Sequence, residues 1–171
     1  MFSKDVTIEG EILAKDWKVN MSKDVKLNTL LAQAGVKKDE TTGALTTPLH
    51  FSTTYQHPEF GQSTGYDYTR TKNPTRVSLE ETLAAIESAN YALATSSGMS
   101  AIVLAFSAFP FGSKVLAVRD LYGGSFRWFA QAEAEGRFAF TYANTEEELL
   151  NNLTEDIDIV YIETPTNPLM V

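Results

Sequence analysis

The stretch KVLAVRDLYGGSFRWFAQAEAEGRFAFTYANTEEELLNNLTEDIDIVYIE, residues 114–163, decides the fold. It contains three short apolar runs, KVLAV, RFAFTYA and DIVYIE, which begin at Lys114, Arg137 and Asp158. Two segments typical of helices lie between them, and the second begins with Thr145 and Glu148 at capping-box spacing. Apolar strands that alternate with helices indicate beta-alpha-beta units, whose parallel strands are buried on both faces. The sequence therefore predicts an α/β fold with a mainly parallel sheet.

The same alternation continues towards the N-terminus. We expect a further strand in the run YALAT, which begins at Tyr91, and a helix in the segment GMSAIVLAFSAF that follows it. Before them, Asn73 and Pro74 form a typical helix start, since Asn caps a helix and Pro is tolerated in its first turn. The sequence therefore predicts a helix from this start to about Ala89.

The first seventy residues have a different character. A short helix is expected where Leu27, Leu30, Leu31 and Ala34 fall at helical spacing before Gly35. Residues 39–65 are rich in turn formers, which favours an extended arm that packs on another surface. Residues 1–20 are expected to be a disordered extension, because the tetrapeptide SKDV recurs directly after Met21, which is a second possible start. We assign residues 21–72 to the arm and residues 73–171 to the α/β domain.

Composition excludes several classes of function. The chain has 171 residues, of which 43% are hydrophobic and 21% charged, enough for one globular domain. The formal net charge is -8, and because phosphodiester backbones are bound by clustered Lys and Arg, nucleic acid is not an expected partner. The absence of cysteine excludes disulfides and thiolate metal sites within this chain. Residues 1–20 contain no apolar run that suits a signal peptide or a membrane span, so we expect a cytoplasmic protein.

Three loops that follow the expected strands carry chemically useful residues. Ligands in open α/β sheets bind outside the carboxyl ends of the strands. The turn 96–100, SSGMS, leads directly into a helix, whose free backbone N–H groups attract a phosphate. The loop 120–124, DLYGG, brings one aromatic ring to the same edge, and the loop 164–168, TPTNP, holds Asn167 between two prolines. Together these loops suit a ligand with a phosphate, a flat ring and a polar ring substituent.

Plainer interpretations exist for each of these residues. Ser-Gly before a helix is often only a cap, and Tyr-Gly-Gly is often only a turn. His50 and His57 lack metal-ligand spacing to any acidic cluster, so no metal site is expected. Five aromatic residues suit a core or an interface better than a cofactor site: Phe106, Phe109, Phe111, Trp128 and Phe129.

Four motifs carry a resemblance to a known family. They are YDYTRTKNPTR at 66–76, ATSSGMSAI at 94–102, DLYGGSFR at 120–127 and ETPTNPL at 163–169. In this order the chain resembles the Cys/Met-metabolism family of fold-type-I pyridoxal-phosphate (PLP) enzymes, from about Met21 to its last residue. The wording of STGYDYTRTKNPTR and ETPTNPLM is most similar to its bacterial cystathionine gamma-synthase branch. The resemblance implies an N-terminal arm followed by the first part of the family's large PLP-binding domain.

The resemblance also implies a role for individual residues. Gly98 and Met99 would offer backbone N–H groups to the phosphate of the cofactor, pyridoxal 5'-phosphate. Tyr122 would stack on the pyridine ring and help to move protons near the leaving group. Tyr68 and Arg70 would bind the phosphate in the site of a neighbouring subunit, which implies a homodimer or homotetramer with a shared site. Asn167 would hydrogen-bond near the ring hydroxyl of the cofactor.

Two parts of the family's active site are not expected in this chain. The cofactor needs a Schiff-base lysine and an acidic partner for its ring nitrogen, which the family supplies beyond the Thr-Asn-Pro loop. Lys72 lies in the arm and Lys114 opens a strand at the end away from the site, and neither resembles the family's lysine motif. We therefore expect a truncated chain that is inactive alone.

Several functions use the same visible residues. The first is gamma-replacement on an O-acylhomoserine with cysteine, as in methionine biosynthesis and transsulfuration. A cystathionine lyase or an O-acetylhomoserine sulfhydrylase, each with small amino-acid substrates, is the alternative within the family. A third interpretation is a non-catalytic remnant or assembly module that keeps a phosphate pocket. It is disfavoured because strands cut from a larger sheet leave an unpaired edge.

Overall fold

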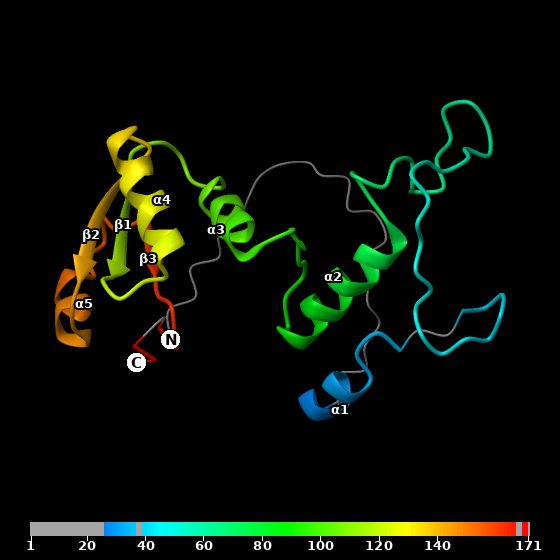
Figure 1. Ribbon diagram of the computed structural model, residues 1–171, viewed down its shortest axis with the longest axis horizontal. Coiled ribbons are helices and arrows are strands. Elements are labelled where there is room, and N and C mark those ends of the chain that lie inside the picture. Colours follow the sequence, from blue (N-terminus) through cyan, green and yellow to red (C-terminus); the bar gives the residue numbers. More distant parts are fainter. Residues whose placement is uncertain (1–25, 37–38, 167–168, 171) are drawn as a thin grey trace. The chain divides into compact units, whose positions relative to one another are not determined.

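The computed structural model describes residues 26–36, 39–166 and 169–170 (Figure 1). The chain divides into two compact units between Ala94 and Thr95. We call residues 26–94 the arm unit and residues 95–170 the sheet unit. The extension expected at residues 1–20 and the second start at Met21 lie outside the described residues, so they stay predictions.

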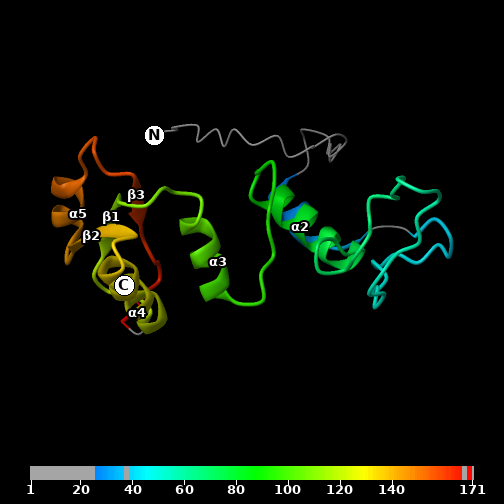
Figure 2. The same cartoon turned by 90° about the horizontal axis from the view of Figure 1, so that it is seen from above.

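A three-stranded parallel sheet organises the sheet unit. Its strands are β1 (Ser113–Val118), β2 (Phe138–Ala143) and β3 (Ile159–Tyr161), in the order β2-β1-β3. Val115 in the central strand pairs with Phe140 on one side and with Ile159 on the other. Parallel neighbours need crossover connections, and the helices α4 (Gly123–Ala134) and α5 (Glu146–Asn152) supply them (Figures 1 and 2). The predicted α/β class and parallel sheet are confirmed.

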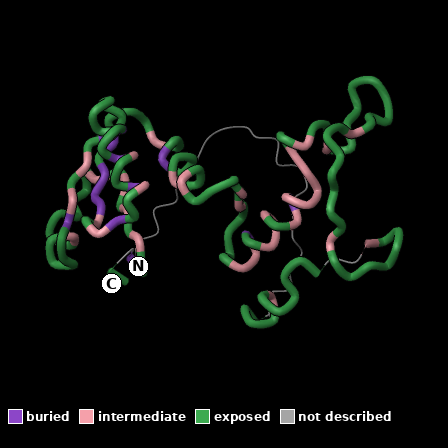
Figure 3. The backbone as a smooth tube through the Cα atoms, viewed as in Figure 1, coloured by how far each residue is buried: buried purple, intermediate pink, exposed green. Residues whose placement is uncertain are grey.

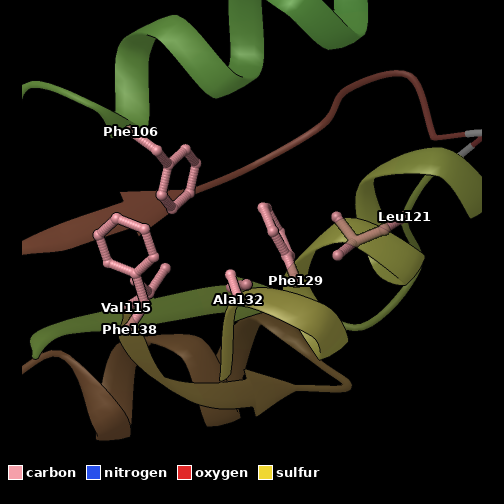
Figure 4. Close-up of a cluster of buried hydrophobic side chains, with 7 residues drawn as sticks. Phe106, Val115, Leu121, Phe129, Ala132 and Phe138 are labelled. Atoms are coloured by element: carbon pink, nitrogen blue, oxygen red, sulfur yellow. The ribbon is translucent and has the colours of Figure 1, made fainter. Parts of the chain in front are cut away.

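An aromatic core covers one face of this sheet (Figure 4). Phe106, the last residue of α3 (Gly98–Phe106), packs there with Phe129 of α4, and their ring centroids are 5.1 Å apart. The other buried members of the cluster come from β1, β2, α4 and the loop after β1: Val115, Ala117, Leu121, Ala132 and Phe138. Phe129 is fully buried, and burying such a side chain stabilises the folded state by about 1.5–3 kcal/mol.

The opposite face of the sheet is covered at its centre. Leu116 points away from Val115 and Ala117, because side chains alternate along a strand, and it is fully buried. The helix α5 contacts β1 and β2. Its N-cap Thr145 accepts a hydrogen bond from the Glu148 N–H at 3.1 Å, as the capping-box spacing predicted. The Glu148 carboxylate in turn accepts from the N–H of Asn144, one residue before the cap.

One predicted strand is not formed. The run 91–95, YALAT, has no regular secondary structure, although the helix α3 begins three residues after it as expected. Tyr91 and Leu93 are 66% and 72% exposed. A strand needs a neighbour to which its N–H and C=O groups can bond, and no described segment pairs with this run. Local apolar character was therefore not sufficient to form the strand.

The arm unit has little core. Its helices are α1 (Leu27–Ala32) and α2 (Pro74–Ile86), and the two contact each other. Asn73 caps α2 by accepting from the Thr75 N–H at 2.9 Å, which confirms the predicted helix start. The described part of the arm between the two helices contains no helix or strand beyond isolated bridges such as that of Thr54 with Tyr68. Figure 3 shows buried positions gathered on the sheet unit, whereas those of the arm unit lie in α2.

Candidate functional site

The turn before α3 has the geometry of an anion site. Ser97 is the N-cap, and its hydroxyl accepts from the Ser100 N–H at 3.1 Å. Gly98 and Met99 are the first two helical residues, so their N–H groups have no partner within the helix. A Cβ atom at Gly98 would meet nothing within 4 Å, which leaves open space beside this turn. The two N–H groups are thus free to bind an anion at the positive end of α3.

The tyrosine of the next loop lies against this helix start. Tyr122 is the N-cap residue of α4, and its side chain is 47% exposed. A Cβ atom added at Gly124 would lie 2.4 Å from Cε1 of Tyr122 and 3.1 Å from Sδ of Met99. A larger residue at this position would displace the Tyr122 ring, because the aromatic ring and the thioether converge on it. The structure therefore brings together two residues that the sequence analysis assigned to one site, Met99 and Tyr122.

A carboxylate after β3 ties this loop to the sheet. The Tyr122 N–H donates to Oε2 of Glu163 at 2.7 Å, while the hydroxyls of Ser125 and Tyr161 each donate to Oε1 at 2.7 Å. Burial raises the pKa of Glu163, but the hydrogen bonds from Ser125, Tyr122 and Tyr161 outweigh it and hold the pKa below its usual value. Burial, together with the bond to Glu163, raises the pKa of Tyr161 to about 12. Glu163 is therefore ionised and Tyr161 is protonated at neutral pH.

A second carboxylate stands at the carboxyl end of β1. Oδ2 of Asp120 is buried and has no hydrogen-bond partner among the described residues. Asp120 directly precedes Leu121, which is buried in the core, and Tyr122. Since buried polar atoms are usually hydrogen-bonded, this oxygen is an unused acceptor beside the tyrosine loop.

Tyr68 and Arg70 lie together in the arm unit. The Arg70 guanidinium donates to the Tyr68 hydroxyl at 3.4 Å, and its carbon lies 5.6 Å from the centre of the tyrosine ring. The segment that carries them is held by Arg76, whose guanidinium donates to the carbonyl oxygens of Thr69, Arg70 and Thr71 at 3.4, 3.4 and 2.7 Å. The pair is thus presented by a fixed piece of backbone at the start of α2.

Two other residues named from the sequence, Asn167 and Lys114, are not among the described residues of this site. Asn167 lies outside the described residues, so its predicted contact with the ring hydroxyl stays a prediction. Lys114 bonds Asp156 at 2.5 Å at the first end of β1, opposite the loops that contain Met99 and Tyr122. A hollow of about 390 Å³ nearby is lined by Lys114, Asp156 and Thr141 among others, and by none of the predicted site residues.

Two kinds of feature are absent from the described residues, a metal-binding cluster and a membrane-spanning helix. No group of three His, Asp or Glu side chains there could hold a metal ion. His57 instead lies 2.9 Å from the carboxylate of Asp67. Among the helices that the structure describes, none has the length and apolar character needed to cross a bilayer.

The contacts of Glu163, Ser125 and Tyr161 were not predicted from the sequence. Glu163 follows β3 directly, and the rule that ligand sites lie at the carboxyl ends of parallel strands would have singled it out. Its partners Tyr122 and Ser125 lie 41 and 38 positions away in the chain, so no local pattern could have revealed them.

The site residues fit the cofactor that the resemblance implies. The open turn at Gly98 and Met99 offers N–H donors for a phosphate, and the half-exposed ring of Tyr122 beside it offers a flat surface. The glycine at position 124 keeps these two features adjacent. A phosphorylated aromatic ring would engage both at once.

Comparisons with known proteins identify a family that uses the same cofactor. The profile of the family described as Cys/Met metabolism PLP-dependent enzyme matches residues 28–171. Cystathionine gamma-synthase/O-acetylhomoserine (thiol)-lyase of Bacillus subtilis is 42% identical over 146 residues, which are 84% of this chain and 39% of that protein. Cystathionine gamma-lyase of the same organism is 38% identical over 85% of this chain and 39% of its own length.

Solved structures give the same result. The crystal structure of cystathionine gamma synthase from Xanthomonas oryzae pv. oryzae, in complex with aminoacrylate and cysteine, matches with a TM-score of 0.78 and 37% identity. The match covers 85% of this chain and 38% of that one. The chain thus spans about 39% of the length of the curated relatives it matches. On this evidence the chain belongs to the Cys/Met-metabolism family of PLP-dependent enzymes.

Proposed function

We propose that the protein to which this chain belongs catalyses gamma-replacement on an O-acylated homoserine, with cysteine or another thiol as the sulfur donor. The observation that carries the proposal is the convergence of Met99 and Tyr122 on Gly124 at the carboxyl end of the sheet. The names of the relatives support the substrate class, since one is a cystathionine gamma-synthase and O-acetylhomoserine (thiol)-lyase. In this proposal the chain supplies the phosphate and ring contacts of the cofactor.

The phosphate is held by the start of α3. The N–H groups of Gly98 and Met99 donate to its oxygens, and the positive end of the helix dipole stabilises its charge. Ser97 keeps the turn in place, because its hydroxyl is engaged with Ser100. Neither role needs a charged side chain, which agrees with the absence of Lys and Arg from residues 95–101.

Tyr122 orients the cofactor ring. Its exposed face stacks on the pyridine, and Gly124 leaves the space that the ring occupies, since a Cβ atom there would lie 2.4 Å from Cε1 of Tyr122. In this proposal the phenol hydroxyl holds or moves a proton at the leaving group of the substrate. Aromatic stacking of this kind contributes about 0.5–1.5 kcal/mol beyond the burial of area.

A neighbouring subunit completes the site. Tyr68 and Arg70 bind the phosphate across a subunit interface, since the fork of a guanidinium matches phosphate oxygens. Their mutual contact keeps the guanidinium beside the phenol before the subunits meet. Asn167 donates or accepts at the ring hydroxyl. The assembly is a homodimer or a homotetramer.

The cofactor, when bound, would supply an electron sink for the carbanion of the substrate, and a lysine of the protein would hold it covalently between turnovers. Neither Lys72 nor Lys114, the two lysines described in residues 39–166, suits that role. Lys114 is bonded to Asp156 at the far end of β1, and Nζ of Lys72 lies 5.2 Å from the centre of the Tyr66 ring. We therefore propose that residues 1–171 bind the cofactor without turning over substrate.

A cystathionine lyase is the second candidate, because cystathionine gamma-lyase of Bacillus subtilis is 38% identical to this chain. The residues that would bind the cofactor are the same in both cases. A lyase cleaves cystathionine, whereas a gamma-synthase forms it from an O-acylhomoserine and cysteine. The two candidates therefore differ only in the substrate panel.

The experiment uses the protein purified from its own cells. It is reduced with borohydride, its intact mass is measured, and it is assayed with O-acylhomoserines, cysteine and cystathionine. A covalent cofactor adduct with cystathionine formation supports the gamma-synthase, and cleavage of cystathionine without its formation supports the lyase. A protein that carries no cofactor adduct and shows neither activity would contradict both.

A further inference from the structure

The carboxylate of Glu163 stands where the end of β3 meets the start of α4. One of its oxygens accepts from the Tyr122 N–H and the other from the hydroxyls of Ser125 and Tyr161, all at 2.7 Å. Both oxygens are therefore used. Tyr161 lies two residues away on the same strand end, whereas Tyr122 and Ser125 belong to the loop and helix that follow β1.

Glu163 caps the start of α4. Tyr122 at the N-cap makes no side-chain capping bond, and the residues after it, Gly123 and Gly124, carry no side chain that could. Glu163 binds the backbone of the N-cap residue and also the side chain of Ser125, three positions later, which is fully buried. Its negative charge lies at the positive end of the helix dipole, where it is stabilising.

The hydrogen bonds of Glu163 to the Tyr122 N–H and the Ser125 hydroxyl restrict the orientation of the Tyr122 ring. The backbone of Tyr122 is fixed by the bond to Glu163, and its ring lies so close to Gly124 that a Cβ atom there would be 2.4 Å from Cε1. Without the bond, two successive glycines would leave the loop free to pivot, since glycine is the most permissive residue. The orientation of the ring thus depends on a residue that does not face the ligand.

We infer that Glu163 is a positioning residue, which holds the Tyr122 ring in the plane that stacks on the cofactor. The inference rests on the proposed function, because it needs Tyr122 to contact the ring. Glu163 acts on the ligand through Tyr122, whereas the N–H groups of Gly98 and Met99 bind the phosphate. Its effect is therefore specific for ligands that have a ring.

The test compares two ligands on the 171-residue chain. Pyridoxine 5'-phosphate has the ring and the phosphate without the aldehyde, so it cannot react with surface lysines, and inorganic phosphate has no ring. Titration calorimetry gives both dissociation constants for the wild type and for Glu163→Ala. We expect Glu163→Ala to raise the dissociation constant for pyridoxine phosphate about tenfold, the range of one hydrogen bond to a charged group. The dissociation constant for inorganic phosphate should stay unchanged.

Three variants separate positioning from a structural role. Glu163→Gln keeps a neutral acceptor for the Tyr122 N–H, while the two hydroxyls can turn to accept from its amide, so we expect it to restore most of the affinity. In a Tyr122→Ala background, Glu163→Ala should have no further effect on either ligand. Glu147→Ala, at an exposed glutamate of α5, is the matched control and should change nothing.

The outcomes are distinct. An equal loss for both ligands, or a loss that persists without Tyr122, would overturn the inference while the proposed function stands. A wild type that binds pyridoxine phosphate no more tightly than phosphate would overturn the ring contact itself, and both proposals with it. Should Glu163→Ala not fold, Glu163→Met fills a similar volume without an acceptor, and the same two ligands decide.

Discussion

The two units of the chain are stabilised in different ways. Among the described residues, the arm unit buries two hydrophobic side chains, Val77 and Ala84, whereas the sheet unit buries nine. The arm unit relies instead on hydrogen bonds around the start of α2, where the Asn73 amide donates to the His50 carbonyl and to the Thr69 hydroxyl. The loop 120–124, which contains Tyr122, is therefore supported by a packed core, whereas Tyr68 and Arg70 are supported by a network of hydrogen bonds.

The largest effect should come from the core of the sheet unit. Phe129→Ala removes a fully buried ring that contacts Phe106 and Phe140, and we expect it to lower the free energy of unfolding by about 3–5 kcal/mol. Phe51→Ala is the matched control in the arm unit, since Phe51 is 89% exposed. Urea unfolding followed by circular dichroism measures both. Equal losses for the two variants would refute the contrast between the units.

A smaller effect is expected at the polar network of the arm unit. Asn73→Ala removes the cap of α2 and the three donor bonds of its amide to the arm, which should cost about 1–2 kcal/mol. Amide hydrogen exchange should quicken in residues 47–72 and stay unchanged in β1. Asn73→Asp keeps the acceptor for the Thr75 N–H but loses the donors, so it should preserve α2 and still loosen the arm. Faster exchange in β1 would show that the two units unfold together.

These outcomes bear on what the sequence alone could predict. The helix starts at Asn73 and Thr145 were predictable because a cap is a local contact. The failed strand at 91–95 was not, since an apolar run becomes a strand only where a partner supplies its hydrogen bonds. Among the site residues, the turn at Gly98 was visible as a motif, whereas the hydrogen bond of Glu163 to Tyr122 joins segments 41 positions apart. Local chemistry was therefore predictable, and contacts distant in the chain were not.

Acid should lower the stability of the sheet unit, because Glu163 becomes protonated as the pH falls. Its folded pKa lies below the ordinary value of 4.5, so the stability that it contributes is fully present above that pH and is lost as the pH falls through the folded pKa. We expect the urea midpoint of the wild type to fall between pH 6 and pH 3 by more than that of Glu163→Gln. The difference between the two proteins should narrow as the pH falls. A constant difference would mean that Glu163 does not titrate with unfolding.

The smallest effect is expected at the surface pair of β1. Lys114 and Asp156 are both more than half exposed, and exposed ion pairs contribute little to stability. Lys114→Met should leave the urea midpoint within error. The hydrogen bond from Lys114 is the largest of the causes that lower the pKa of Asp156 to about 2, so that pKa should rise towards its usual value, as followed by NMR titration. A clear loss of stability in Lys114→Met would contradict this expectation and show that the ion pair stabilises this end of the sheet.

The most direct measurement is an NMR titration of the chain with pyridoxine 5'-phosphate, in which the backbone amides and the aromatic ring protons are followed. Residues 95–170 are proposed to bind the cofactor phosphate through the N–H groups of Gly98 and Met99, with Tyr122 beside them. We predict saturable shifts of the Gly98 and Met99 amides, together with shifts of the Tyr122 ring protons, and no change in β2. Saturable binding that leaves Gly98, Met99 and Tyr122 unmoved, or no binding at millimolar ligand, would contradict the assignment of this site.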